Sequence, residues 1–64
     1  MNYLRRLQLL GMTAADLTRY ICEKHEPIGY KAVSRTVMTP EVGSVKTVRL
    51  IEAALNELEV MKNA

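Results

Sequence analysis

The stretch that decides the fold is Gly29-Tyr30-Lys31-Ala32-Val33-Ser34-Arg35-Thr36-Val37-Met38. Val33 and Val37 stand four residues apart, so they share one face of a helix, and we expect that face to be buried. The opposite face carries two cations, a ring and a hydroxyl, supplied by Tyr30, Lys31, Ser34 and Arg35. Base edges in the major groove of DNA are recognised by groups of this kind. The stretch therefore predicts a helix with DNA-reading chemistry, provided that its flanks build a scaffold around it.

Length and composition limit what this scaffold can be. The chain has 64 residues, enough for one domain, residues 1–64, with a thin core. It has four Met and no Phe or Trp, so aliphatic side chains and Met must fill that core, as in small helical bundles. A pocketed enzyme is not expected at this size. The net charge of +2 permits DNA binding without demanding it.

The residue types that often carry chemistry do not form a recognisable set. Cys22 is the single cysteine, so no intramolecular disulfide is possible, and a reducing cytosol is the simplest context. One Cys and one His, His25, cannot supply the four ligands of a zinc site. No nucleophile, base and orienting acid stand together. We expect no catalysis, metal or cofactor, with Cys22 packed in its helix and His25 at the surface of a turn.

The N-terminal segment predicts a short amphipathic helix over residues 1–10, which Gly11 ends in a left-handed conformation. Its apolar stripe is Leu4, Leu7 and Leu10 or Met1, and its solvated side is Arg5, Arg6 and Gln8. The apolar run is too short for a signal sequence or a membrane span. We therefore expect a cytoplasmic protein that makes no use of a membrane. Because domains this small often gain core by self-association, we also expect a homodimer.

A capping-box spacing predicts that the next helix begins at Ala14. Thr13 would cap this helix, and the side chain of Asp16, at the third helical position, would accept a hydrogen bond from the backbone of Thr13 in return. Met12 and Leu17 are placed as a hydrophobic staple. The buried face of this helix continues through Leu17, Tyr20 or Ile21, and Lys24. It ends at Glu26-Pro27-Ile28-Gly29, because the residue before a Pro disfavours the helical conformation.

A long last helix completes the expected fold. The segment Thr39-Pro40-Glu41-Val42-Gly43 ends the helix of residues 30–38, and Ser44 is placed to cap the next one, which frays over residues 62–64. Its apolar stripe is Val45, Val48, Ile51 or Leu55, and Leu58, opposite Lys46, Arg49, Glu52 and Glu59. Either a dimer seam or packing against two neighbouring helices explains the additional apolar residues Leu50, Leu55, Val60 and Met61. The sequence thus predicts an all-α domain of four helices with a helix-turn-helix.

These residues resemble the DNA-binding headpiece of the lac-repressor type, within the wider lambda-repressor-like (Cro/C1-type) fold. Residues 13–20 resemble the family's opening helix, Thr-x-x-Asp-Val-x-x-Tyr. Residues 29–37 are similar to its recognition helix, which has Tyr, a polar residue, Val-Ser-Arg and another Val. Residues 46–58 resemble the helix that follows, with Lys46-Thr47, Glu52-Ala53-Ala54 and Glu57-Leu58. The resemblance covers roughly two-thirds of the chain and implies a helix-turn-helix fold that binds DNA.

The chain also departs from that family. Segment 22–28 is several residues longer than the family's tight turn, which changes how the second helix supports the recognition helix. Lys31 stands where the family commonly has a smaller or amide-bearing residue, so we expect a different preferred base. Residues 1–11 resemble instead the first helix of the lambda-repressor and Cro type. The family's hinge helix and sugar-binding domain have no counterpart, so effector control of that kind is not implied.

The function that we expect is sequence-specific binding of double-stranded DNA by a small repressor of the phage or mobile-element kind, as a dimer on a palindromic operator. Tyr30, Lys31 and Arg35, with Ser34 beside them, would read bases, and the two cations favour guanine O6 and N7. Phosphate contacts would come from expected helix N-termini and one cation: Thr13, Gly29, Ser44 and Lys46.

Other interpretations remain open on the sequence. Thr13 and Ser44 can act as caps alone, and the outward face of residues 30–38 can be an ordinary solvated surface. The modest net charge and the longer turn are also consistent with a protein-interaction module that inhibits or recruits another protein. An excisionase-like or antitoxin DNA-binding role is a further alternative.

Overall fold

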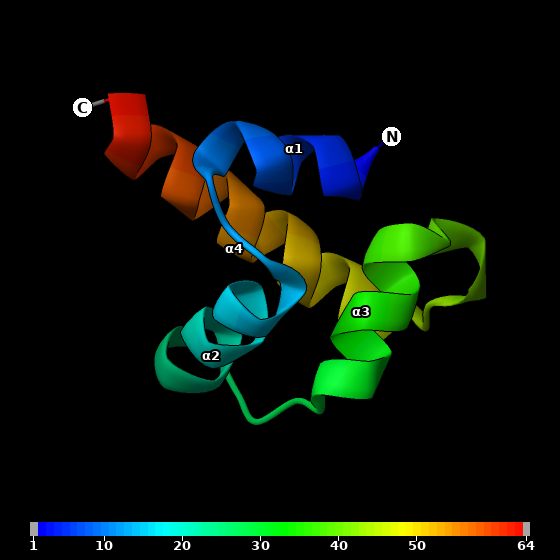
Figure 1. Cartoon of the computed structure of the whole chain (residues 1–64). Coiled ribbons are helices and arrows are strands. Elements are labelled where there is room, and N and C mark those ends of the chain that lie inside the picture. The colour runs from blue at the N-terminus through cyan, green and yellow to red at the C-terminus, as the bar shows by residue number, and fades with distance from the viewer. Residues whose placement is uncertain (1, 64) are drawn as a thin grey trace.

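Residues 2–63 are described by a computed structural model, and they form four α-helices and no strand (Figure 1). The elements in chain order are α1 (Tyr3–Leu10), α2 (Ala14–Lys24), α3 (Tyr30–Met38), the short 3-10 turn η1 (Pro40–Val42) and α4 (Val45–Asn63). The predicted all-α class is confirmed, as are the starts of the last three helices. Part of the first expected helix, Met1, lies outside the described residues, and so does Ala64.

The long helix α4 is the element on which the other helices pack. It contacts α1, α2 and α3, and α2 and α3 also contact each other. In Figure 1, α1 lies along one side of α4 and runs in the same direction, and α2 lies on the other side. The helix α3 lies near the end at which α4 begins, where it also contacts α1. The core is shared by all of these helices and consists of Tyr3, Leu7, Leu17, Ile21, Val33, Val37, Ile51, Ala54 and Leu55.

The first helix differs from the prediction at one position of the face that it buries. Asn2 caps α1, since its Oδ1 accepts a hydrogen bond from the Arg5 N–H at 3.0 Å, so the helix begins at Tyr3. Tyr3 is 4% exposed, whereas Leu4, which we expected in the core, is 36% exposed. The ring of Tyr3 fills the core while burial, followed by the nearby Glu52 carboxylate, raises the pKa of its hydroxyl. Leu7 is buried and Leu10 packs against the core, as predicted, so counting only aliphatic residues was wrong at one position, where it chose Leu4 in place of Tyr3.

Local signals at the first connection act as predicted. Gly11 ends α1 with a φ of 70°, in the left-handed region that glycine adopts at least cost. Thr13 and Asp16 form a reciprocal capping box: the Asp16 N–H donates to Thr13 Oγ1 at 3.2 Å, and the Thr13 N–H donates to the Asp16 carboxylate at 3.0 Å. The helix α2 consequently begins at Ala14.

In the long connection between α2 and α3, the Cys22 thiol at the end of α2 is hydrogen-bonded to the backbone of Ile28. The Sγ of Cys22 lies 3.3 Å from the carbonyl oxygen of Ile28 and 3.4 Å from its amide nitrogen. Ile28 packs against the core, so this bond ties the end of the connection back to α2. The prediction that Cys22 packs within its helix is wrong, because the side chain is exposed and reaches across the loop. Lys24, expected on the buried face of α2, is exposed as well.

The first turn of α4 also differs from the prediction. Val45 is 68% exposed, and the contact of α4 with the core begins one turn later, at Val48. Leu55 is fully buried and Leu50 packs against the core, so contacts within the monomer explain both residues. Val60 and Met61 remain exposed.

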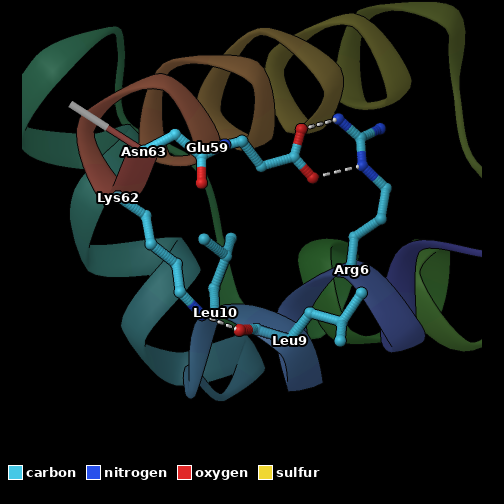
Figure 2. A pocket seen from close by; sticks show the side chains of 6 residues that line it. All are labelled: Arg6, Leu9, Leu10, Glu59, Lys62 and Asn63. Carbon is cyan, nitrogen blue, oxygen red and sulfur yellow. Dashed lines mark hydrogen bonds and ion pairs between the residues drawn. The ribbon is translucent and has the colours of Figure 1, made fainter.

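The C-terminal turn of α4 is ordered against α1, contrary to the fraying that we expected over residues 62–63. Figure 2 shows this junction, in which the Lys62 ammonium donates to the carbonyl oxygen of Leu9. Arg6 binds both carboxylate oxygens of Glu59 at 2.8 Å through its Nε and Nη2. This pair holds the pKa of Glu59 below its usual range. Arg6 was expected on the solvated side of α1, but its side chain is only 18% exposed.

Candidate nucleic-acid interface

The helix α3 is fixed in orientation by its inner face. Val33, Thr36 and Val37 are all buried, and the helix contacts α1, α2, η1 and α4. Because these side chains recur at helical spacing, the opposite side of α3 must face solvent. The fold therefore presents the outward side of α3 rigidly.

The structure brings the predicted base-reading residues together on this outward side. Tyr30 is 53% exposed, and Lys31 and Arg35 are exposed as well. Ser34 is half-buried, at the edge of the group. Together with Ala32 these residues line a shallow hollow. The outward face is thus a continuous surface with one aromatic ring and two cations.

The two cations on this face have no partner among the described residues. Within residues 2–63, the side chains of Tyr30, Lys31 and Arg35 make no hydrogen bond or ion pair, and α3 itself contains no acid. Arg6, Arg19 and Lys46, by contrast, are paired with Glu59, Asp16 and Glu26. Lys31 and Arg35 can therefore bond an incoming acceptor without first breaking a contact.

The N-terminus of α3 is open. Gly29 precedes the helix with no side-chain cap, and a Cβ added at Gly29 would meet nothing within 4 Å. The first-turn N–H groups of a helix carry partial positive charge and have no partner within the helix. This end of α3 can accept water or a phosphate oxygen.

The N-terminus of α2 is occupied instead. The Asp16 carboxylate lies there in the capping box with Thr13, and the backbone and side-chain hydrogen bonds of Thr13 hold the pKa of Asp16 below its usual value. A phosphate placed at Thr13 would meet this negative charge, so the geometry disfavours the predicted phosphate contact there. Thr13 acts as a cap.

The N-terminus of α4 carries the two remaining predicted phosphate contacts. Ser44 caps the helix, with its Oγ accepting from the Thr47 N–H at 3.2 Å and donating to Thr47 Oγ1 at 2.9 Å. The Lys46 ammonium lies 2.7 Å from a carboxylate oxygen of Glu26, which belongs to the loop before α3. Lys46, which the sequence placed on the solvated side of its helix, is thus paired with an acid.

Two residues near Lys46 were not singled out by the sequence. Arg49 is exposed, is unpaired within the described part of the chain, and lines with Glu26 and Lys46 a hollow of about 590 Å³. The spacing of Lys46 and Arg49 already places both cations on one side of a helix. Glu26 carries no comparable signal, because only the tertiary fold brings the loop before α3 to the first turn of α4.

A second polar cluster ties the end of α2 to α4. One carboxylate oxygen of Glu57 accepts from the Tyr20 hydroxyl at 2.7 Å and lies 3.0 Å from His25 Nε2. The hydrogen bond from Tyr20, followed by that from His25, lowers the pKa of Glu57. The same bond to Glu57 raises the pKa of Tyr20. The polar side chains of this cluster are thus paired with one another. The contact between His25 and Glu57 holds the start of the loop that leads to α3 against α4.

Within residues 2–63, no group of three or more His, Cys, Asp or Glu side chains is placed to hold a metal ion. None of the helices described combines the length and apolar character needed to cross a membrane. The chain matches no protein-family model, no curated protein and no solved structure.

Proposed function

We propose that this chain is a sequence-specific regulator that binds double-stranded DNA and reads the major groove with α3. The observation that carries the proposal is the outward side of α3, where Lys31 and Arg35 are exposed and unpaired beside Tyr30. The buried inner face of the same helix holds these side chains on a rigid element. The backbone that carries them is thus preorganised, although the free Lys31 and Arg35 side chains still lose rotamer freedom when they bind.

The spacing of the cations suits neighbouring base pairs. Lys31 and Arg35 are four residues apart, which corresponds to about 6 Å along a helix axis. Stacked base pairs are about 3.4 Å apart, so the two side chains would reach bases within about two steps of each other. Arg35 can bond guanine O6 and N7 bidentately, which is worth about 1–3 kcal/mol against a wrong base. Tyr30 adds an apolar ring and a hydroxyl, and Ser34 lies at the margin.

Backbone contacts would flank this reading surface. The open N-terminus of α3 at Gly29 and the first turn of α4, with Ser44 and Lys46, are candidate phosphate contacts. The resemblance of residues 13–20, 29–37 and 46–58 to lac-repressor-type headpieces supports the same arrangement, with α2 and α3 as the helix-turn-helix. In that interpretation the chain acts in the cytoplasm as a repressor, and a dimer on a palindromic operator would place its two α3 helices about 34–36 Å apart.

Arg35→Ala tests the proposal, with Arg5→Ala as the matched control. Both side chains are exposed cations without an ion pair in the described part of the chain, but Arg5 lies on α1. Fluorescence anisotropy with randomised duplexes, followed by sequencing of the bound fraction, gives the preferred site of the native chain. We expect Arg35→Ala to lose about 1–3 kcal/mol on that site and its preference at one base, and Arg5→Ala to keep both.

Equal binding of selected and random duplexes by the native chain and by Arg35→Ala would overturn the assignment of α3. An absence of salt-dependent binding, together with a co-purified partner, would favour the protein-interaction module instead. Bending of the bound duplex would favour the excisionase-like or antitoxin role over simple repression.

A further inference from the structure

An ion pair joins the two segments that flank α3. Glu26 lies in the loop before α3, and Lys46 lies in the first turn of α4. The Lys46 Nζ is 2.7 Å from Glu26 Oε1, and the two side chains are 72% and 44% exposed. The pair is therefore at the surface, and its acid lies three residues before Gly29, which precedes the helix that presents Lys31 and Arg35.

The pair changes the charge that this edge shows to an approaching polyanion. Lys46 and Arg49 would otherwise present two cations on one side of α4. With Glu26 in contact, Lys46 is neutralised, and only Arg49 is unpaired in the hollow that these residues line. A phosphate group that approaches Lys46 must either displace the Glu26 carboxylate or share the ammonium with it, and in both cases it lies close to that negative charge.

We propose that Glu26 competes with DNA phosphate for Lys46 and thereby limits how tightly the chain binds DNA of any sequence. This inference rests on the proposed function. Exposed ion pairs are weak in water, so the carboxylate can be displaced, and the competition tunes binding without abolishing it. Phosphate contacts carry no sequence information, so Glu26 should weaken binding to every duplex by a similar factor.

Glu26→Gln is the direct test, because it removes the charge while keeping the size of the side chain. A freed Lys46 that neutralises one phosphate steepens the slope of log K against log salt by about 0.9. At 0.1 M salt this corresponds to a gain of up to about 8-fold, which shrinks as the salt concentration approaches 1 M. Anisotropy titrations from low to high salt, with the selected duplex and with a random duplex, should show the same gain for both.

Glu23→Gln is the matched control for net charge. Glu23 is exposed on α2 and has no ion pair within the described residues, so its loss frees no cation. Lys46→Met, introduced into the native chain and into Glu26→Gln, shows whether the gain passes through Lys46. We expect the steeper slope of Glu26→Gln to disappear when Met stands at position 46.

Equal slopes for Glu26→Gln and Glu23→Gln would overturn this inference, and so would a gain that persists fully with Met at position 46. These failures differ from a failure of the proposed function. If Arg35→Ala weakens binding to the selected duplex while Glu26→Gln changes nothing, only the competition is wrong. If Arg35→Ala binds like the native chain, the assignment of α3 itself is wrong.

Discussion

The close approach of Gly43 to Thr36 gives a sharp prediction about how α3 is held. Thr36 is 2% exposed on the inner face of α3, and Gly43 lies between η1 and α4. A Cβ added at Gly43 would stand 2.5 Å from Thr36 Cγ2, 2.6 Å from its Oγ1 and 3.1 Å from its Cβ. Real Cβ atoms essentially never come this close to another heavy atom. Gly43→Ala must therefore displace either Thr36 or the turn.

We expect Gly43→Ala to lower the free energy of unfolding by about 1–3 kcal/mol, the usual cost of overpacking a core. For a domain of this size each kcal/mol moves the melting temperature by about 4–8 °C. Gly29→Ala is the matched control, because its backbone is equally extended and its added Cβ meets nothing within 4 Å. That control should stay within about 1 kcal/mol of the native chain, because the restriction of the unfolded chain by Ala offsets the poorer N-cap that Ala provides.

A second substitution shows whether Thr36 is the cause. Thr36→Ala removes the two atoms that lie at 2.5 and 2.6 Å, so it should relieve most of the clash in the Gly43→Ala background. Urea unfolding followed by circular dichroism gives the four free energies of the double-mutant cycle. We expect a coupling of about 1–3 kcal/mol in favour of the double variant. Additive effects of the two substitutions, or a Gly43→Ala variant as stable as Gly29→Ala, would refute the steric explanation.

Two further predictions concern the caps and the charged junctions. Thr13→Ala removes the acceptor for the Asp16 N–H and should cost about 0.5–2 kcal/mol in urea unfolding, whereas a loss below that range would mean that water replaces the cap. The pKa of Glu59 is lowered in the folded chain by Arg6, so its stabilisation is present above the unfolded pKa of about 4.3 and is lost as the pH falls through the lower folded value. The urea midpoint should therefore drop between pH 6 and pH 3, and Glu59→Gln should reduce that drop. A pH profile of Glu59→Gln that equals that of the native chain would contradict this account of the junction.

Most of the fold followed from local sequence signals. The start of α2 depends on a capping box whose members are three residues apart, and the end of α1 depends on a glycine in a left-handed conformation. The buried face of α3 follows from the spacing of Val33 and Val37 within one helix, and its bounds follow from the breaks at Pro27 and Gly29 and at Pro40. These features depend on neighbours in the chain, so they can be read without knowing the fold.

The candidate interface was predictable in part for the same reason. Helical spacing alone indicates that Tyr30, Lys31 and Arg35 face away from the core, and the structure places them so. Their role as base readers stays a prediction. The sequence could not show that these cations have no partner while Lys46 has one, because each ion pair except that of Arg19 joins residues far apart in the chain.

The sequence by itself thus determined the four helices, the caps of α2 and α4 and the outward face of α3, because short-range hydrogen bonding and periodicity govern them. The tertiary structure decided that Tyr3 rather than Leu4 enters the core and that Arg6 binds Glu59. It also decided that the Cys22 thiol clasps the loop before α3 and that Glu26 holds Lys46. These contacts depend on how the helices pack on α4, and side chains that are distant in sequence become neighbours only when the apolar faces have been buried together.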